Sequence, residues 1–213
     1  MHWIDHDFLP DIGGTVERFI VNHHGEIDGL VLEYEPDRFV LVHLPPHLGP
    51  EITAAIKRGD AVRVRGIRPR GADMISAVAI IASDDRLILD NGPGHEIEPK
   101  PKRLHEKTKR SEVAGVVRIS LFGPKGELRG ALLENGDVIR VVPKEAARIA
   151  ALLRPGSRLA ARGEGLESAH GRVVSAAEIG FDPTRLRPVK ESPAQPKPKK
   201  PHGDPPARSM TVE

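Results

Sequence analysis

A stretch of eight residues occurs twice in the chain and constrains the fold more than any other feature. Residues 25–32 read G-E-I-D-G-L-V-L, and residues 126–133 read G-E-L-R-G-A-L-L. A short apolar run with one arginine precedes each copy, with Arg18 in the first run and Arg118 in the second. Another apolar run, a proline, an Ala/Ile/Leu-rich run and a glycine-started run follow each copy. The repeat therefore predicts two modules with the same order of elements.

Each module is predicted to contain three strands, then one helix, then two strands. β-branched residues bounded by turn residues indicate the strands, and an apolar spacing of i, i+3 and i+4 indicates the helix. In the first module the expected strands are 16–21, 27–32, 38–44, 61–66 and 74–81, and the expected helix is 50–57. In the second module the expected strands are 115–121, 128–133, 138–142, 159–163 and 173–179, and the expected helix is 146–153.

Two glycines in each copy have an expected role in the architecture. Gly25 and Gly126 lie in turns, where the absence of a side chain permits a positive φ. Gly29 and Gly130 lie inside the second strand, where glycine indicates a bulge or a sharp bend. Both explanations concern the backbone, and neither requires a ligand.

This element order, with a glycine inside the second strand, resembles the OB-fold, a small five-stranded Greek-key barrel. The resemblance covers both modules and implies a mostly β protein with two such barrels, each with one helix between strands three and four. The composition of the linker and of the tail predicts disorder. The expected organisation is a lead-in at 1–14, OB-like modules at 15–82 and 112–182, a basic linker at 83–111 and a Pro/Lys-rich tail at 183–213.

The excess positive charge of the chain lies outside the two modules. Residues 15–82 carry 8 Lys and Arg against 9 Asp and Glu, and residues 112–182 carry 10 against 9. Residues 100–110 carry 6 basic residues and one Glu, and residues 184–208 carry 7 basic and 2 acidic residues. Basic segments displace counterions from phosphates, so the linker and tail are expected to add salt-sensitive affinity for nucleic acid.

The OB-fold resemblance implies binding of single-stranded nucleic acid on the face of strands two and three and on the adjoining loops. Aromatic rings would stack on bases, and cations would contact phosphates. Aromatic residues make up only 3% of the chain, so few stacking rings exist, and a solvated arginine face is the competing interpretation. The matching residues are Arg18, Arg38, Phe39, Arg63, Arg65, Arg118, Phe122, Lys125, Arg140 and Arg162, with Lys197, Lys199 and Lys200 in the tail.

The histidines raise a second hypothesis, a metal site. A helix would place His43 and His47 on one face, but Pro45 and Pro46 exclude a helix there. A site would therefore need distant histidines to converge, and surface or turn histidines are the simpler interpretation. No metal and no cofactor is expected. Six of the ten histidines lie in the first 47 residues, namely His2, His6, His23, His24, His43 and His47.

The chain lacks the common catalytic signatures. No phosphate-binding loop, zinc-protease helix, nucleophile elbow or dinucleotide fingerprint is present, so we expect a protein without enzymatic activity. A protein-interaction adaptor is the alternative function, because the P-K-P-K-K-P segment could occupy a groove that binds polyproline helices. The chain has no cysteine and no apolar window of about 18 residues, which favours a soluble cytoplasmic protein.

Overall fold

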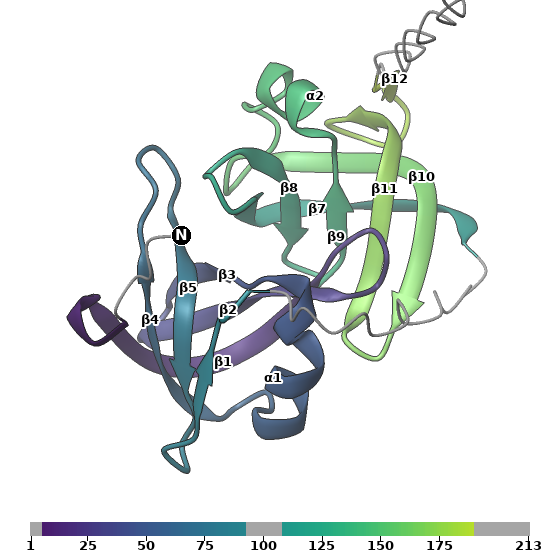
Figure 1. Ribbon diagram of the computed structural model, residues 1–213. Coiled ribbons are helices and arrows are strands. Elements are labelled where there is room, and N and C mark those ends of the chain that lie inside the picture. The colour runs from purple at the N-terminus through teal and green to yellow at the C-terminus, as the bar shows by residue number, and fades with distance from the viewer. Residues whose placement is uncertain (1–5, 93–107, 190–213) are drawn as a thin grey trace, which may run out of the picture.

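Two β-barrels dominate the computed structural model, which describes residues 6–92 and 108–189 (Figure 1). Most of the predicted linker and tail, including Lys197, Lys199 and Lys200, lies outside the described residues. The first barrel contains β1 (Asp11–Val21), β2 (Ile27–Glu35), β3 (Arg38–His43), α1 (Gly49–Ala55), β4 (Ala61–Ile67) and β5 (Met74–Ile81). The second contains β7 (Lys109–Phe122), β8 (Leu128–Leu133), β9 (Val138–Arg140), α2 (Pro143–Arg148), β10 (Arg158–Ser168) and β11 (Gly171–Gly180).

Each barrel closes through a parallel pair between its third and fifth strands. In the first barrel, antiparallel pairs join β1 to β2, β2 to β3, β1 to β4 and β4 to β5, and the parallel pair β3–β5 closes the ring. The second barrel repeats this order, with the parallel pair β9–β11 as its closure. The helix lies between the third and fourth strands in both. The predicted mostly β fold class, with two five-stranded OB-like barrels, is therefore confirmed.

The structure adds short elements around the predicted ones. A 3-10 helix, η1 (His6–Phe8), precedes the first barrel, and β1 begins at Asp11, inside the predicted lead-in. A second 3-10 helix, η2 (Pro46–Leu48), leads into α1. Two additional strands, β6 (Leu87–Leu89) and β12 (Arg187–Pro188), each pair antiparallel with the fifth strand of their barrel. Parts of the predicted linker and tail therefore extend the sheets.

No helix among the described residues is long and apolar enough to cross a membrane.

The expected helix at 146–153 is wrong in its bounds. α2 ends at Arg148, and the chain continues through turns in which the Leu152 N–H donates to Ile149 O at 2.8 Å. The Leu153 N–H donates in the same manner to Ala150 O, and Leu153 is fully buried. Both bonds span three residues, so turns of the 3-10 type replace the α-helix after Arg148.

The glycines of the repeat have the predicted roles. Gly25 and Gly126 adopt φ values of 80° and 79° in the turns between the first two strands of each barrel. The register of β1 with β2 shifts beside Gly29, and that of β7 with β8 shifts beside Gly130. A Cβ atom at Gly130 would overlap the carbonyl oxygen of Ile139 on the neighbouring strand. The bulges leave two residues, Asp28 and Arg129, between paired positions.

The two barrels pack against each other through one continuous apolar cluster. The buried cluster that fills the first barrel also includes side chains of the second, namely Leu121, Leu132, Val138, Leu166 and Val173. The contacts are reciprocal. A Cβ atom at Gly25, in the β1–β2 turn, would lie 2.6 Å from Leu166 at the end of β10. A Cβ atom at Gly126, in the β7–β8 turn, would lie 3.0 Å from Pro69 in the β4–β5 loop. Reciprocity of this kind characterises a two-fold symmetric interface.

Candidate nucleic-acid interface

The junction between the barrels covers much of the face on which nucleic-acid contacts were predicted. Leu41 on β3 is 3% exposed, and Val138 on β9 is also 3% exposed. Arg140, expected at an accessible strand edge, is 9% exposed. The prediction that Arg140 is available to a ligand is wrong in this arrangement, because the packing of the two barrels encloses its side chain.

The guanidinium of Arg140 joins the two barrels. It donates to the carbonyl oxygen of Val21 at 2.9 and 3.1 Å and to Asp28 Oδ1 at 2.5 Å. Burial disfavours charge on both partners, so it raises the pKa of Asp28 and lowers the pKa of Arg140. The ion pair and the bonds to Val21 offset this cost. Arg140 therefore fixes the relative position of the barrels.

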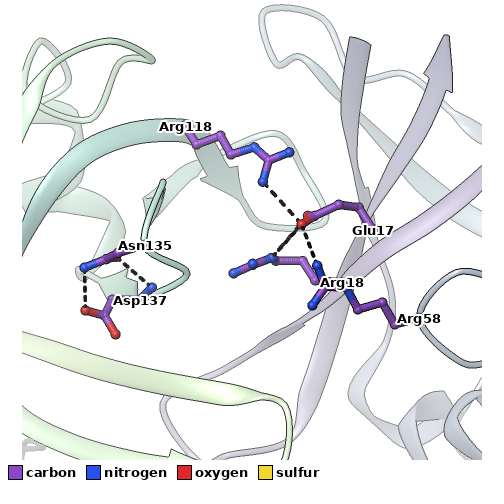
Figure 2. Close-up of polar contacts among 6 residues, drawn as sticks. All are labelled: Glu17, Arg18, Arg58, Arg118, Asn135 and Asp137. Atoms are coloured by element: carbon purple, nitrogen blue, oxygen red, sulfur yellow. Dashed lines mark hydrogen bonds and ion pairs between the residues drawn. The ribbon is translucent and has the colours of Figure 1, made fainter. Parts of the chain in front are cut away.

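A second ion pair lies where the two modules present equivalent residues. Glu17 is skipped in the pairing of β1 with β2, and Arg118 is skipped in the pairing of β7 with β8, so both occupy bulges. The Arg118 guanidinium donates to Glu17 Oε1 at 3.2 Å, as Figure 2 shows. The repeat comparison that matched Arg18 with Arg118 is thus off by one position. Arg118 corresponds to Glu17, and the equivalent positions carry opposite charges.

A cleft of about 380 Å³ opens at this junction, and we call it the junction cleft. The Arg118 guanidinium carbon lies 4.2 Å from the ring centroid of Phe39, within the range of a cation–π interaction. Phe39 and Phe122 come from different barrels and are both half-buried. The cleft thus combines two rings and one cation from predicted positions. Its lining residues are Phe39, Leu41, Asp73, Arg118, Ile119, Ser120, Phe122 and Pro155.

Arg18 lies beside Arg118 at Glu17, but the other predicted cations of the described residues do not gather into one patch. Arg162 bonds Glu112 at 2.6 Å and Glu178 at 3.1 Å, and Arg65 bonds Asp7 and contacts His6. Arg65 and Arg162, both predicted to contact nucleic acid, are thus held in ion pairs within the chain. Arg38 pairs with Glu35 at 2.8 Å, Arg63 lies 3.8 Å from Asp85, and both arginines remain more than half exposed. Lys125 is exposed beside Gly126, next to the β4–β5 loop.

Sequence reasoning missed three residues at the junction. Asp28 and Arg129 occupy the same position of the repeated stretch with opposite charges, which was a visible signal. Opposite charges at equivalent positions allow two similar modules to pack without like-charge contacts. Arg58 lies in the turn after α1, with its Nη2 atom 3.8 Å from Glu17 Oε1, and no sequence pattern distinguished it.

The histidines show no metal arrangement within residues 6–92 and 108–189. No group of three or more His, Cys, Asp or Glu side chains in these ranges could hold a metal ion. His47 Nε2 lies 3.2 Å from Asp90 Oδ1. The rings of His23 and His24 lie 3.8 Å apart between centroids. His2 lies outside the described residues.

His43 occupies on β3 the position that Arg140 occupies on β9. Both residues pair with the bulge glycine of the adjacent strand, His43 with Gly29 and Arg140 with Gly130. Burial lowers the pKa of His43 to about 4, and the nearby charges of Arg140 and Arg129 act in the same direction. His43 is therefore neutral near pH 7 and contributes as an uncharged group.

The pKa of His43 predicts acid sensitivity. Because its folded value of about 4 lies below the unfolded value of 6.5, the unfolded chain binds the proton first. Stability is therefore complete above pH 6.5 and falls, by an amount on the order of 3 kcal/mol, as the pH drops toward 4. His43→Gln is expected to reduce the dependence of the free energy of unfolding on pH, measured in urea between about pH 7 and about pH 5, whereas His170→Gln, an exposed control, leaves this dependence unchanged. An equal pH dependence of the free energy of unfolding in the unsubstituted protein and both variants would contradict the assignment of this dependence to His43.

Both modules are OB-like barrels. No protein-family model and no curated protein matches the chain. Among solved structures, the chain is similar to the single-stranded DNA binding protein of Thermus aquaticus at 16% identity, with 87% of this chain and 94% of that chain covered and a TM-score of 0.25. A deletion mutant of the same Thermus aquaticus protein matches at 14% identity, with coverages of 87% and 96% and a TM-score of 0.25.

Proposed function

We propose that the chain binds single-stranded nucleic acid, without enzymatic turnover, at the junction cleft. The observation that carries the proposal is that Phe39 and Phe122, from different barrels, line one cleft in which the Arg118 guanidinium lies against the Phe39 ring. Base stacking on aromatic rings contributes to single-strand binding whatever the base, and arginine adds cation–π and phosphate contacts. A duplex keeps its bases paired and stacked, so the rings favour a single strand.

The other cations predicted to contact nucleic acid would attract its phosphates through charge alone. Arg63 and Lys125 are exposed on the barrels, and the cations of the linker and tail include Lys197, Lys199 and Lys200. Such contacts are independent of base sequence and weaken with added salt. We propose that they raise the affinity of the chain without determining where a base is bound.

Replacing Phe39 with alanine tests the proposed function. Loss of one stacking ring is expected to weaken binding of a labelled single-stranded oligonucleotide about tenfold, measured by fluorescence anisotropy. Tyr34→Ala is the matched control, because Arg38 lies 5.3 Å from the Tyr34 ring centroid and neither residue lines the junction cleft.

Thermal unfolding of both variants provides the check on folding. Tyr34→Ala is expected to bind like the unsubstituted protein. Equal losses in Phe39→Ala and Tyr34→Ala would contradict the assignment to the junction cleft. Absence of oligonucleotide binding by the unsubstituted chain at low salt would contradict the proposed function itself.

A further inference from the structure

Three arginines surround one carboxylate at the edge of the junction cleft. Arg18 Nε lies 3.1 Å from Glu17 Oε2, Arg118 Nη1 lies 3.2 Å from Glu17 Oε1, and Arg58 Nη2 lies 3.8 Å from that same Oε1 (Figure 2). We call Arg18, Arg58 and Arg118 the arginine triad. The triad belongs to both barrels, because Arg118 lies on β7 and the other two arginines belong to the first barrel.

The triad has more positive charge than its carboxylate can neutralise. Three guanidinium cations against one carboxylate leave two positive charges in excess. Glu17 is 13% exposed, whereas Arg58 is 71% exposed and, within the part of the chain that the structure describes, makes only the 3.8 Å contact to Glu17. The neighbouring acid Asp137 is already bonded by Arg172 at 2.7 and 2.8 Å. The excess charge is therefore accessible from solvent on the side of Arg58.

We propose that the arginine triad binds the terminal phosphate of a nucleic-acid strand. A terminal phosphate carries nearly two negative charges near neutral pH, whereas an internal phosphodiester carries one. Two excess positive charges thus match a phosphate monoester better than a diester. Guanidinium groups also bind phosphate oxygens with two parallel hydrogen bonds.

The position of Arg118 connects the triad to the junction cleft. Its guanidinium contacts both Glu17 and the ring of Phe39. A terminal phosphate at the triad would place its own nucleotide next to Phe39. This inference rests on the proposed function, because it identifies the strand end as the part of the ligand that the junction recognises.

The test compares three single-stranded oligonucleotides of one sequence and about 12 nucleotides, with a 5′ phosphate, a 3′ phosphate or neither. We expect one phosphorylated form to bind about tenfold more tightly than the unphosphorylated form, in fluorescence anisotropy with an internal label. Arg58→Gln is expected to remove most of this preference, because it deletes one of the two excess charges.

Arg63→Gln is the matched control. Arg63 forms an ion pair with Asp85 of the same 3.8 Å length and is 54% exposed on β4. Its loss is expected to weaken all three oligonucleotides equally and to leave the preference unchanged. Equal binding of all three by the unsubstituted protein would overturn the terminal-phosphate site while leaving the proposed function intact. Binding of none of them would overturn both.

Discussion

Replacing Arg140 with alanine is expected to lower the free energy of unfolding by about 3–5 kcal/mol. The change leaves the carboxylate of Asp28 inside the junction without its partner and removes both bonds to the carbonyl oxygen of Val21. Urea unfolding followed by circular dichroism measures the loss. Arg38→Ala is the matched control, because the Arg38–Glu35 pair has a 2.8 Å contact but is exposed, and its loss should cost far less stability than the loss of Arg140.

A double substitution separates the ion pair from the general packing of Arg140. In Asp28→Leu with Arg140→Met, neither partner is left as an unpaired buried charge, so stability should recover well above that of Arg140→Ala. A double variant as unstable as Arg140→Ala would show that the loss comes from packing. A loss below about 1 kcal/mol in Arg140→Ala would contradict the buried junction.

Replacing Gly130 with alanine is expected to destabilise the second barrel by about 3 kcal/mol or more. Gly130 has a φ of 147°, and an added Cβ atom would overlap the carbonyl oxygen of Ile139, which is part of the backbone. Neither conflict can be relieved by moving a side chain. The measured quantity is the free energy of unfolding in urea.

Gly156→Ala is the control that isolates the effect of backbone conformation. Gly156 also has a positive φ, of 82°, but a Cβ atom there would meet open space. Its replacement should cost about 1 kcal/mol, the cost of a left-handed backbone alone. Similar losses at Gly130 and Gly156 would contradict the claim that the close approach of β8 and β9 requires glycine.

The architecture of each barrel was predictable because it depends on local signals. The turn glycines Gly25 and Gly126 require positive φ, and the bulge glycines allow strands to approach, so each copy of the repeat specifies its own hairpin. The bounds of α2 were harder to predict. Its apolar spacing continues to Leu153, but the hydrogen bonds after Arg148 span three residues, as in turns, and not four, as in an α-helix.

The candidate site was less predictable, because it depends on how the two modules pack. Alternation along a strand indicates which residues leave the barrel core, but not whether another module covers them. Arg140 and Leu41 point away from the core of their own barrel and are nevertheless buried at the junction. The equivalence of Arg118 with Glu17 was available in the sequence, because the copies of the repeat begin at residues 25 and 126 and residue 118 then aligns with residue 17.

Crosslinking tests the central claim, that a single strand binds at the junction cleft, most directly. A single-stranded oligonucleotide containing bromodeoxyuridine is irradiated with the full-length chain at moderate salt, and the crosslinked peptides are identified by mass spectrometry. We predict crosslinks in the peptides that contain Phe39 and Phe122, which line the cleft from both barrels. Crosslinks confined to the linker or tail, with none in these two peptides, would contradict the claim.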